Sequence, residues 1–190
     1  IGIPPMRWLR LEQVTVQTSR QQRRFTMMKG LDMSTPRIVH IATDHAGLDA
    51  SHAIQEHLRE RGFEVHDHGP QSYDPQDDYP AFCIHAAQAV VADRQAGKDA
   101  LGIVLGGSGN GEQIAANKVD GVRAALVWNE STALLARQHN DANVVALGAR
   151  QHPEEEMIHL IDLFLDEPFS NEERHVRRIG QISQFEAERG

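Results

Sequence analysis

A buried strand, a glycine-rich loop and the start of a helix follow one another near the middle of this 190-residue chain. The apolar run 100–105 is typical of a buried strand, and four glycines follow it: Gly106, Gly107, Gly109 and Gly111. Together these parts place backbone N–H groups at a helix N-terminus, which is a common binding site for anions.

The residues after the glycines exclude the two best-known phosphate loops. A P-loop needs Lys and then Ser or Thr where this chain has Glu112 and Gln113. The dinucleotide-binding fingerprint needs glycine or alanine at the position of Glu112. The loop therefore offers N–H donors beside one carboxylate, which suits removal of a carbon-bound proton while the amides hold the oxyanion. A purely structural tight turn is the alternative.

Apolar runs alternate with helical patterns from residue 37 onward. The expected strands are 37–42, 64–68, 100–105, 122–128 and 144–147, and the expected helices are 48–61, 79–96, a short helix ending at 118, 131–139, 153–165 and 172–188. This alternation predicts an α/β fold with a parallel, doubly wound sheet and helices on both faces.

The composition argues against nucleic-acid and membrane partners. The net charge is −8, and no apolar run approaches the roughly 20 residues of a membrane helix. The single cysteine, Cys83, excludes an internal disulfide and a cysteine-based metal site and fits a reducing cytosol. We therefore expect a cytoplasmic protein in which Cys83 is a packed core thiol.

The first part of the chain differs from the rest. Residues 1–32 hold six Arg or Lys and two Asp or Glu, without the apolar core of a signal peptide. An organelle transit peptide has this composition, but we favour a disordered tail or upstream sequence translated ahead of a start at Met33. Residues 1–36 are expected to be such a leader, and residues 37–190 a single domain with a C-terminal helix.

Polar residues near the ends of the expected strands are candidate site residues. They are Asp44 and His45 after the first strand, residues 108–112 after the third, and His139, Asn140 and Arg150 around the fifth. Because ligands bind outside the carboxyl ends of parallel strands, we expect these residues to converge. Asp44 can instead simply cap the following helix, and either histidine can be an exposed polar residue.

A basic cluster opens the last expected helix, at Arg174-His175-Val176-Arg177-Arg178. Arg174 and Arg178 are four residues apart, so they share a helix face and can clamp a phosphate. The alternative is a solvated face, although cations are unfavourable in a first helical turn. No metal site is expected, because His66 and His68 share a strand face without further ligands at a recognisable spacing.

Six motifs occur in the order found in one enzyme family. They are Ile-Ala-Thr-Asp44-His45-Ala-Gly, Asp78-Tyr79-Pro80, Gly-Gly-Ser108-Gly-Asn-Gly-Glu112, Ile-Ala-Ala-Asn-Lys118, Arg137-Gln-His139-Asn140 and Arg174-His-Val-Arg-Arg178. From about Arg37 to Glu188, the chain closely resembles the sugar-phosphate isomerase family that contains ribose-5-phosphate isomerase B and the galactose-6-phosphate isomerase subunits.

The resemblance implies a three-layer α/β/α sandwich with a five-stranded parallel, Rossmann-like sheet. It also implies a homodimer with shared active sites, or a tetramer of such dimers. The implied reaction interconverts D-ribose 5-phosphate and D-ribulose 5-phosphate through a cis-enediolate, as in the pentose phosphate pathway, without a metal or organic cofactor. The alternatives are isomerisation of galactose 6-phosphate, allose 6-phosphate or erythrose 4-phosphate, and a non-catalytic sugar-phosphate sensor.

The resemblance also assigns roles by motif. His139 with Asp44 would assist ring opening, and the loop amides of Gly107, Gly109, Asn110 and Gly111 would hold the enediolate. The phosphate would bind His45, Arg150, Arg174 and Arg178, the last two from the partner protomer, while Tyr79, Asn140 and His175 would line the substrate site.

One residue departs from the commonest family pattern. Many members carry a cysteine base in the glycine loop where this chain has Ser108, and an unassisted serine is too weak to remove a carbon-bound proton. Another branch uses a glutamate at the position of Glu112, so we assign Glu112 as the base and Ser108 as a hydrogen-bonding helper. The helix N-terminus tends to keep Glu112 ionised, and only burial can raise its pKa.

Overall fold

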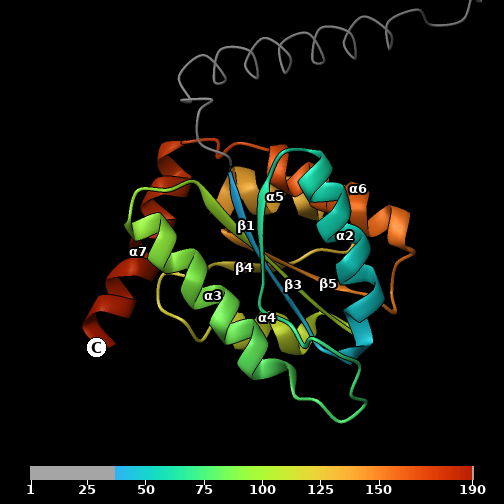
Figure 1. The fold of residues 1–190 in the computed structure, drawn as a ribbon. Helices are drawn as coiled ribbons and strands as arrows, with labels where there is room; N and C mark the ends of the chain where they lie inside the picture. Colours follow the sequence, from blue (N-terminus) through green and yellow to red (C-terminus); the bar gives the residue numbers. More distant parts are fainter. Residues whose placement is uncertain (1–36, 190) are drawn as a thin grey trace, which may run out of the picture. The chain divides into compact units, whose positions relative to one another are not determined.

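The computed structural model describes residues 37–189, so the leader expected at residues 1–36 lies outside the described residues. The five strands within residues 37–189 are all parallel and lie in the order β2-β1-β3-β5-β4 (Figure 1). Their bounds are β1 Ile38–Thr43, β2 Glu64–Asp67, β3 Ala100–Gly106, β4 Ala124–Leu126 and β5 Val144–Gly148. The predicted parallel, doubly wound sheet is confirmed.

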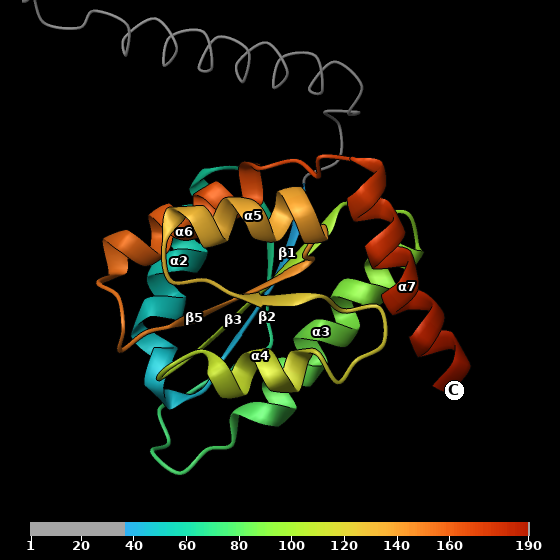
Figure 2. The same ribbon diagram turned by 180° about the vertical axis from the view of Figure 1, so that it is seen from behind.

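Helices cover both faces of the sheet, as Figures 1 and 2 show. On one face pack α2 (Leu48–Glu60), α5 (Glu130–Asn140) and α6 (Glu154–Asp166), and on the other α3 (Tyr79–Gln95) and α4 (Asn110–Ala116). A short 3₁₀ helix, η1, spans His45–Gly47, and α7 spans Glu173–Arg189. This is the expected three-layer α/β/α sandwich.

The two faces of the sheet differ in the size of their side chains. The core under α2, α5 and α6 contains large residues such as Ile41, Leu105 and Phe164, all fully buried. The core under α3 and α4 is rich in small residues, among them Ala86 and Ala146. The central strands β3 and β5 are buried on both faces, which explains why both read as continuous apolar runs.

The fourth strand is shorter than predicted. Strand pairing is limited to Ala124–Leu126, whereas the apolar pattern covered residues 122–128. The strand lies at the sheet edge, paired with β5 alone, and a turn bond from Val122 N–H to the Val119 carbonyl precedes it. Trp128, which follows the strand, is 58% exposed.

Helix α7 lies beside α5 and carries exposed apolar side chains. Within the described part of this helix, only His175 is buried, whereas Val176, Ile182 and Phe185 are 50%, 47% and 63% exposed. Its C-terminal half is bonded to the turn before β4 through Glu186, which accepts the Gly121 N–H at 3.1 Å. Among residues 37–189, no helix combines the length and apolar character needed to cross a membrane.

Candidate active site

Two glycines of the loop lie in close contact with side chains of the candidate active site. Any residue larger than glycine at these positions would collide with those side chains. A Cβ atom at Gly106 would overlap the carboxylate of Glu112. A Cβ at Gly111 would lie 2.6 Å from the phenol oxygen of Tyr79. Gly109 has a positive φ of 80° as the N-cap of α4, which favours glycine further. The glycines therefore leave space for Glu112 and Tyr79.

Glu112 lies in the first turn of α4 and is 4% exposed. Burial raises the pKa of this carboxyl above its ordinary value, and the negative charge of Asp44 raises the pKa further. Backbone N–H groups at the start of the helix lower it. Burial outweighs the helix terminus, which is the balance that the sequence left open.

Asp44 follows β1 and is 7% exposed. One of its oxygens accepts the Ala46 N–H at 2.9 Å, so the residue does cap the element that follows, here η1. The same carboxylate also acts electrostatically on Glu112. The cap and an active-site role are therefore compatible, because they use the same ionised group.

Cys83 lies close enough to this pair of carboxylates to be affected by their charge. It is fully buried in the core under α3 and α4, as predicted. Burial raises the pKa of its thiol to about 12, and the charges of Glu112 and Asp44 contribute to the rise. The thiol is therefore a packing group at neutral pH and not a nucleophile.

Two of the predicted phosphate-binding residues, Arg150 and His45, belong to this part of the chain. The guanidinium of Arg150 packs over Gly107, where a Cβ would be 3.5 Å from Nη1, and the Arg150 N–H donates to the Gly107 carbonyl at 3.2 Å. His45 begins η1, and its Nδ1 is 2.6 Å from Oδ1 of Asp77. Both come from segments that follow carboxyl ends of strands, as expected.

Ser108 lies at the exposed rim of the loop. Its hydroxyl oxygen accepts hydrogen bonds from the backbone and side-chain N–H groups of Asn110, each at 3.3 Å, so the hydroxyl proton is free to donate elsewhere. A hollow of about 360 Å³ opens beside it. Its lining residues are Ser108, Asn110, Leu126, Val127, Trp128, Gly148, Gln151 and His152.

His139 and Asn140 lie at the opposite ends of the strands from the glycine loop, which corrects the expectation that they converge with Asp44, His45 and residues 108–112. His139 and Asn140 end α5 and precede β5 instead of following it. The seven residues of β3, at about 3.3 Å each, separate the amino and carboxyl ends of the strands by roughly 20 Å. Arg174, His175 and Arg178 lie with them at the start of α7.

These residues form a second polar cluster. The rings of His139 and His175 stack with centroids 4.2 Å apart, and Nε of Arg174 donates to Nε2 of His175 at 3.2 Å. Burial lowers the pKa of His175, as do the neighbouring His139 and arginines. The cluster presents cationic groups, which suits an anionic ligand.

The family model described as "Ribose/Galactose Isomerase" matches residues 39–182. The chain belongs to this family. It is 50% identical over 148 residues to ribose-5-phosphate isomerase B of Mycobacterium tuberculosis, covering 78% of this chain and 89% of that protein. It is 38% identical over 146 residues to ribose-5-phosphate isomerase B of Escherichia coli, covering 77% and 94%.

A solved structure agrees with the family assignment. Ribose-5-phosphate isomerase B from Mycoplasma genitalium with bound ribulose-5-phosphate matches this isomerase-family chain with a TM-score of 0.74 and 44% identity. The match covers 80% of this chain and 97% of that one. The resemblance found in the sequence is confirmed.

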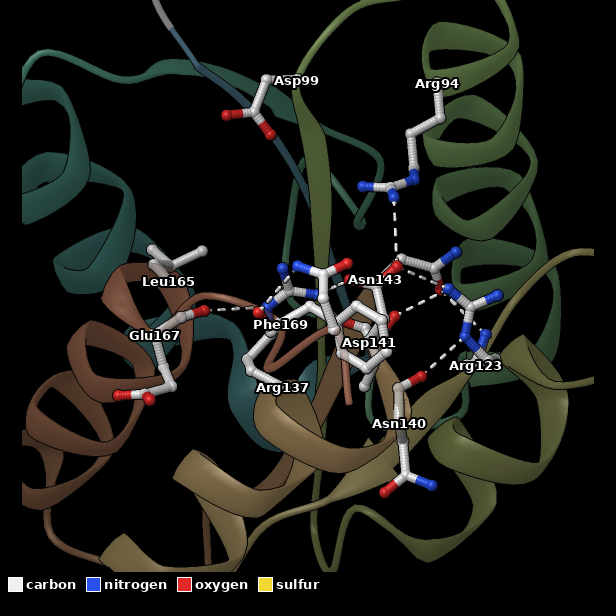
Figure 3. A network of polar contacts seen from close by, with 12 residues as sticks. Arg94, Asp99, Arg123, Arg137, Asn140, Asp141, Asn143, Leu165, Glu167 and Phe169 are labelled. Carbon is white, nitrogen blue, oxygen red and sulfur yellow. Dashed lines mark hydrogen bonds and ion pairs between the residues drawn. The ribbon is translucent and has the colours of Figure 1, made fainter. Parts of the chain in front are cut away.

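A network of arginines supports the second cluster of this isomerase-family chain and was not predicted (Figure 3). Asp141, at φ 41° after α5, binds Nη1 of Arg137 at 2.7 Å, Nη2 of Arg123 at 3.0 Å and Nη2 of Arg94 at 3.7 Å. Nε of Arg123 also donates to the Asn140 carbonyl at 2.8 Å. The network thus fixes the turn that carries His139 and Asn140.

Sequence reasoning also missed Asp77, which lies in the loop between β2 and α3. Asp44, His45 and Asp77 each place one ligand atom within 4.8 Å of the others, and they are the one group in residues 37–189 that could hold a metal ion. Nδ1 of His45 is already joined to Oδ1 of Asp77, so a cation would compete with that pair for these two atoms. The position of Asp77 just before Asp78-Tyr79-Pro80 was the available signal.

Proposed function

We propose that this chain is an aldose–ketose isomerase that interconverts D-ribose 5-phosphate and D-ribulose 5-phosphate. The observation that carries the proposal is Glu112, a buried carboxylate with a raised pKa beside the N–H groups of the glycine loop. A general base is most effective when its pKa lies near the working pH. The names of the relatives, and the ribulose-5-phosphate bound to one of them, support this substrate pair.

In the proposed reaction, Glu112 removes the proton from C2 of the open-chain aldose. The electron pair moves through C1 to O1 and gives a cis-enediolate, whose negative charge is stabilised by the N–H groups of residues 107–111. Ser108 donates a hydrogen bond from its hydroxyl group to a substrate oxygen and keeps its proton. Return of the proton to C1, with transfer of the O2 proton to O1, gives the ketose.

The active site is completed by a second copy of the chain. His45 and Arg150 bind the phosphate from one protomer, and Arg174 and Arg178 bind it from the other. His139 of one protomer opens the sugar ring together with Asp44 of the other, and Asn140 and Tyr79 contact the sugar. The location of the two clusters at opposite ends of the strands supports this arrangement. The exposed apolar side chains of Val176, Ile182 and Phe185 on α7 also support it.

The reaction takes place in the cytoplasm, where sugar phosphates are retained because their charge prevents them from crossing the membrane. The single cysteine and the net charge of −8 support this proposal.

Replacement of the base tests the reaction. We expect Glu112→Gln to lower kcat by at least about 10²-fold, the usual contribution of a positioned general base. Folding and binding of inorganic phosphate should persist, because the substitution keeps the size of the side chain. Ser108→Ala should cost less than Glu112→Gln, and the reverse order would mean that the two roles are exchanged.

Isotope exchange separates catalysis from mere binding. Wild-type protein in deuterated water should place deuterium at C2 of ribose 5-phosphate, because the proton removed by Glu112 exchanges with solvent. If both turnover and exchange are absent while phosphate still binds, the chain is a non-catalytic sugar-phosphate sensor.

The same chemistry on galactose 6-phosphate is the second candidate, because the family description includes galactose isomerases. Turnover on ribose 5-phosphate, galactose 6-phosphate, allose 6-phosphate and erythrose 4-phosphate, compared as kcat/KM, distinguishes the candidates. The proposal requires ribose 5-phosphate to have the highest value.

A further inference from the structure

His45 is held by a single carboxylate oxygen. Oδ1 of Asp77 lies 2.6 Å from the ring Nδ1 and 3.1 Å from the backbone nitrogen of His45. A carboxylate can only accept, so Nδ1 carries a proton and donates it. This leaves Nε2 as the ring nitrogen that can meet a ligand, and it fixes the ring and the main chain of His45 together.

The other carboxylate oxygen of Asp77 is buried and makes no hydrogen bond among the described residues. The Asp77 side chain is 9% exposed, and its Oδ2 atom is buried without a hydrogen-bond partner among residues 37–189. An unsatisfied buried carboxylate oxygen is destabilising, and such groups are rare in native structures. Among the described residues, both hydrogen bonds of the Asp77 carboxylate go to His45, one to its backbone and one to its ring.

The same loop contacts His45 from a second side. The ring of Tyr73, which also lies between β2 and α3, packs edge-on against the His45 imidazole with centroids 5.9 Å apart and an interplanar angle of 86°. Tyr73 is 64% exposed, so packing in the core does not explain its place. Asp77 and Tyr73 together restrict the rotation of the imidazole.

We propose that Asp77 is a positioning residue that orients His45 so that Nε2 donates to the phosphate group of the substrate. Because the Nδ1–H of His45 is held by Asp77, Nε2 is the ring position that can bond to a phosphate oxygen. The inference rests on the proposed role of His45 in phosphate binding. Asp77 itself does not touch the substrate.

Steady-state kinetics of Asp77→Asn tests the proposal. We expect KM for ribose 5-phosphate to rise by about tenfold, the usual loss for one charge-assisted hydrogen bond, while kcat changes by less than about threefold. The matched control is Asp78→Asn, which removes the same charge from the adjacent residue, whose side chain makes no capping bond in the described structure. Its KM should stay within about twofold of the wild-type value. An unchanged KM in Asp77→Asn, or a loss confined to kcat, overturns the proposal.

A double-mutant cycle checks that Asp77 acts through His45. In a His45→Asn background, Asp77→Asn should change KM by less than about twofold, because the group that it orients is gone. Additive losses would show that Asp77 acts independently and would overturn the proposal. A nitrogen-15 NMR spectrum of labelled histidine gives a second readout, since the Nδ1–H signal of His45 should move in Asp77→Asn but not in Asp78→Asn.

Titration with inorganic phosphate separates this inference from the proposed function. If the wild type binds phosphate but does not isomerise ribose 5-phosphate, and Asp77→Asn still weakens phosphate binding, the function is wrong and the inference stands. If the wild type isomerises and Asp77→Asn binds phosphate normally, the inference is wrong and the function stands.

Discussion

At Glu112, the start of a helix and the protein interior act on the same carboxyl group in opposite directions. A helix N-terminus contributes a fraction of a charge and a few N–H donors, which favour the ionised form. Burial removes the water that would solvate the charge, and the nearby Asp44 adds repulsion. The raised pKa means that the interior dominates, and the result is a stronger base than an exposed glutamate.

This balance predicts the acid limb of the pH profile. Glu112 must be ionised to accept a proton, so kcat/KM should fall as the pH drops through a pKa above the ordinary value of 4.5. In Asp44→Asn, where the neighbouring negative charge is removed, the limb should move to lower pH even though overall activity is reduced. A limb that stays in place in Asp44→Asn would contradict the electrostatic coupling between the two carboxylates.

Gly106 is a second residue whose role follows from contact distances. An added methyl group would occupy the place of the Glu112 carboxylate, so Gly106→Ala should displace the base and lower kcat/KM by at least about 10²-fold. Gly107→Ala places its methyl group 3.5 Å from Arg150, an ordinary contact, and should cost far less. Equal losses in the two variants, measured by initial rates, would show that the loop needs glycine for conformation alone.

At the residue scale, the sequence predicted groups that act through local pattern and missed those that act through distant contact. Asp44 follows β1 directly and Glu112 follows β3 after the short glycine loop, so chain order alone placed both at the carboxyl ends of the strands. Asp77 pairs with a residue 32 positions away, and a polar loop without periodicity gives no sign of such a partner. Whether burial or the helix terminus sets the pKa of Glu112 also depends on packing that no local pattern contains.

At the scale of elements, hydrophobic period and turn residues were sufficient for most boundaries. β3 is an uninterrupted apolar run, and α2 ends within one residue of the expected helix 48–61, just before Gly62 with its φ of 86°. β4 was overestimated because its apolar pattern continues beyond the three residues that pair with β5. The length of an edge strand depends on how many of its residues pair with the one neighbouring strand. That number is set by the sheet and cannot be found from the apolar pattern of the strand itself.

The edge formed by β1 and β2 has a histidine pair that links stability to pH. Nδ1 of His40 is 2.9 Å from Nε2 of His68, and burial is the main cause that lowers the pKa of each. His40 also faces Asp93, His66 and Lys98, and His68 also faces Asp67, His66 and His85. The folded state therefore favours the neutral rings.

The sign of the pH effect follows from these lowered values. Unfolded histidines titrate near 6.5, so below that pH the unfolded chain binds more protons than the folded chain. The free energy of unfolding should thus fall as the pH drops from 6.5 through the folded-state values, by at most about 1.4 kcal/mol per pH unit for each proton. In His68→Asn, chemical denaturation between pH 7 and 5 should show a shallower slope, and an unchanged slope would assign the effect to other groups.

At the scale of the molecule, each chain carries two clusters of polar residues at opposite ends of its parallel strands. Glu112, Asp44 and Arg150 lie near the carboxyl ends of the strands, and His139 and Arg174 lie near their amino ends. Family resemblance indicated a shared site from the sequence, but the position of His139 within the chain became clear only from the direction of α5 relative to β5. In the proposed dimer, a two-fold axis brings the carboxyl-end cluster of each chain to the amino-end cluster of its partner, so that both sites are complete.

Mixing two inactive variants tests this assembly. Glu112→Gln and His139→Asn should each be nearly inactive alone, because each lesion affects both sites of its own dimer. After the two are denatured and refolded together, about half of the dimers should be mixed, with one intact site each, so that about one quarter of the wild-type activity returns. The absence of any recovery, despite mixed dimers on native mass spectrometry, would contradict a site shared between chains.

If the site is shared between two chains as proposed, the separation of the two clusters by the length of one strand has a consequence for inheritance. In a cell with two copies of the gene, an allele damaged at the carboxyl edge and an allele damaged at the amino edge would restore growth together, although neither supports it alone. Two alleles damaged at the same edge would not rescue each other. Inactivating mutations would therefore fall into two complementation groups, one at the carboxyl ends of the strands and one at their amino ends.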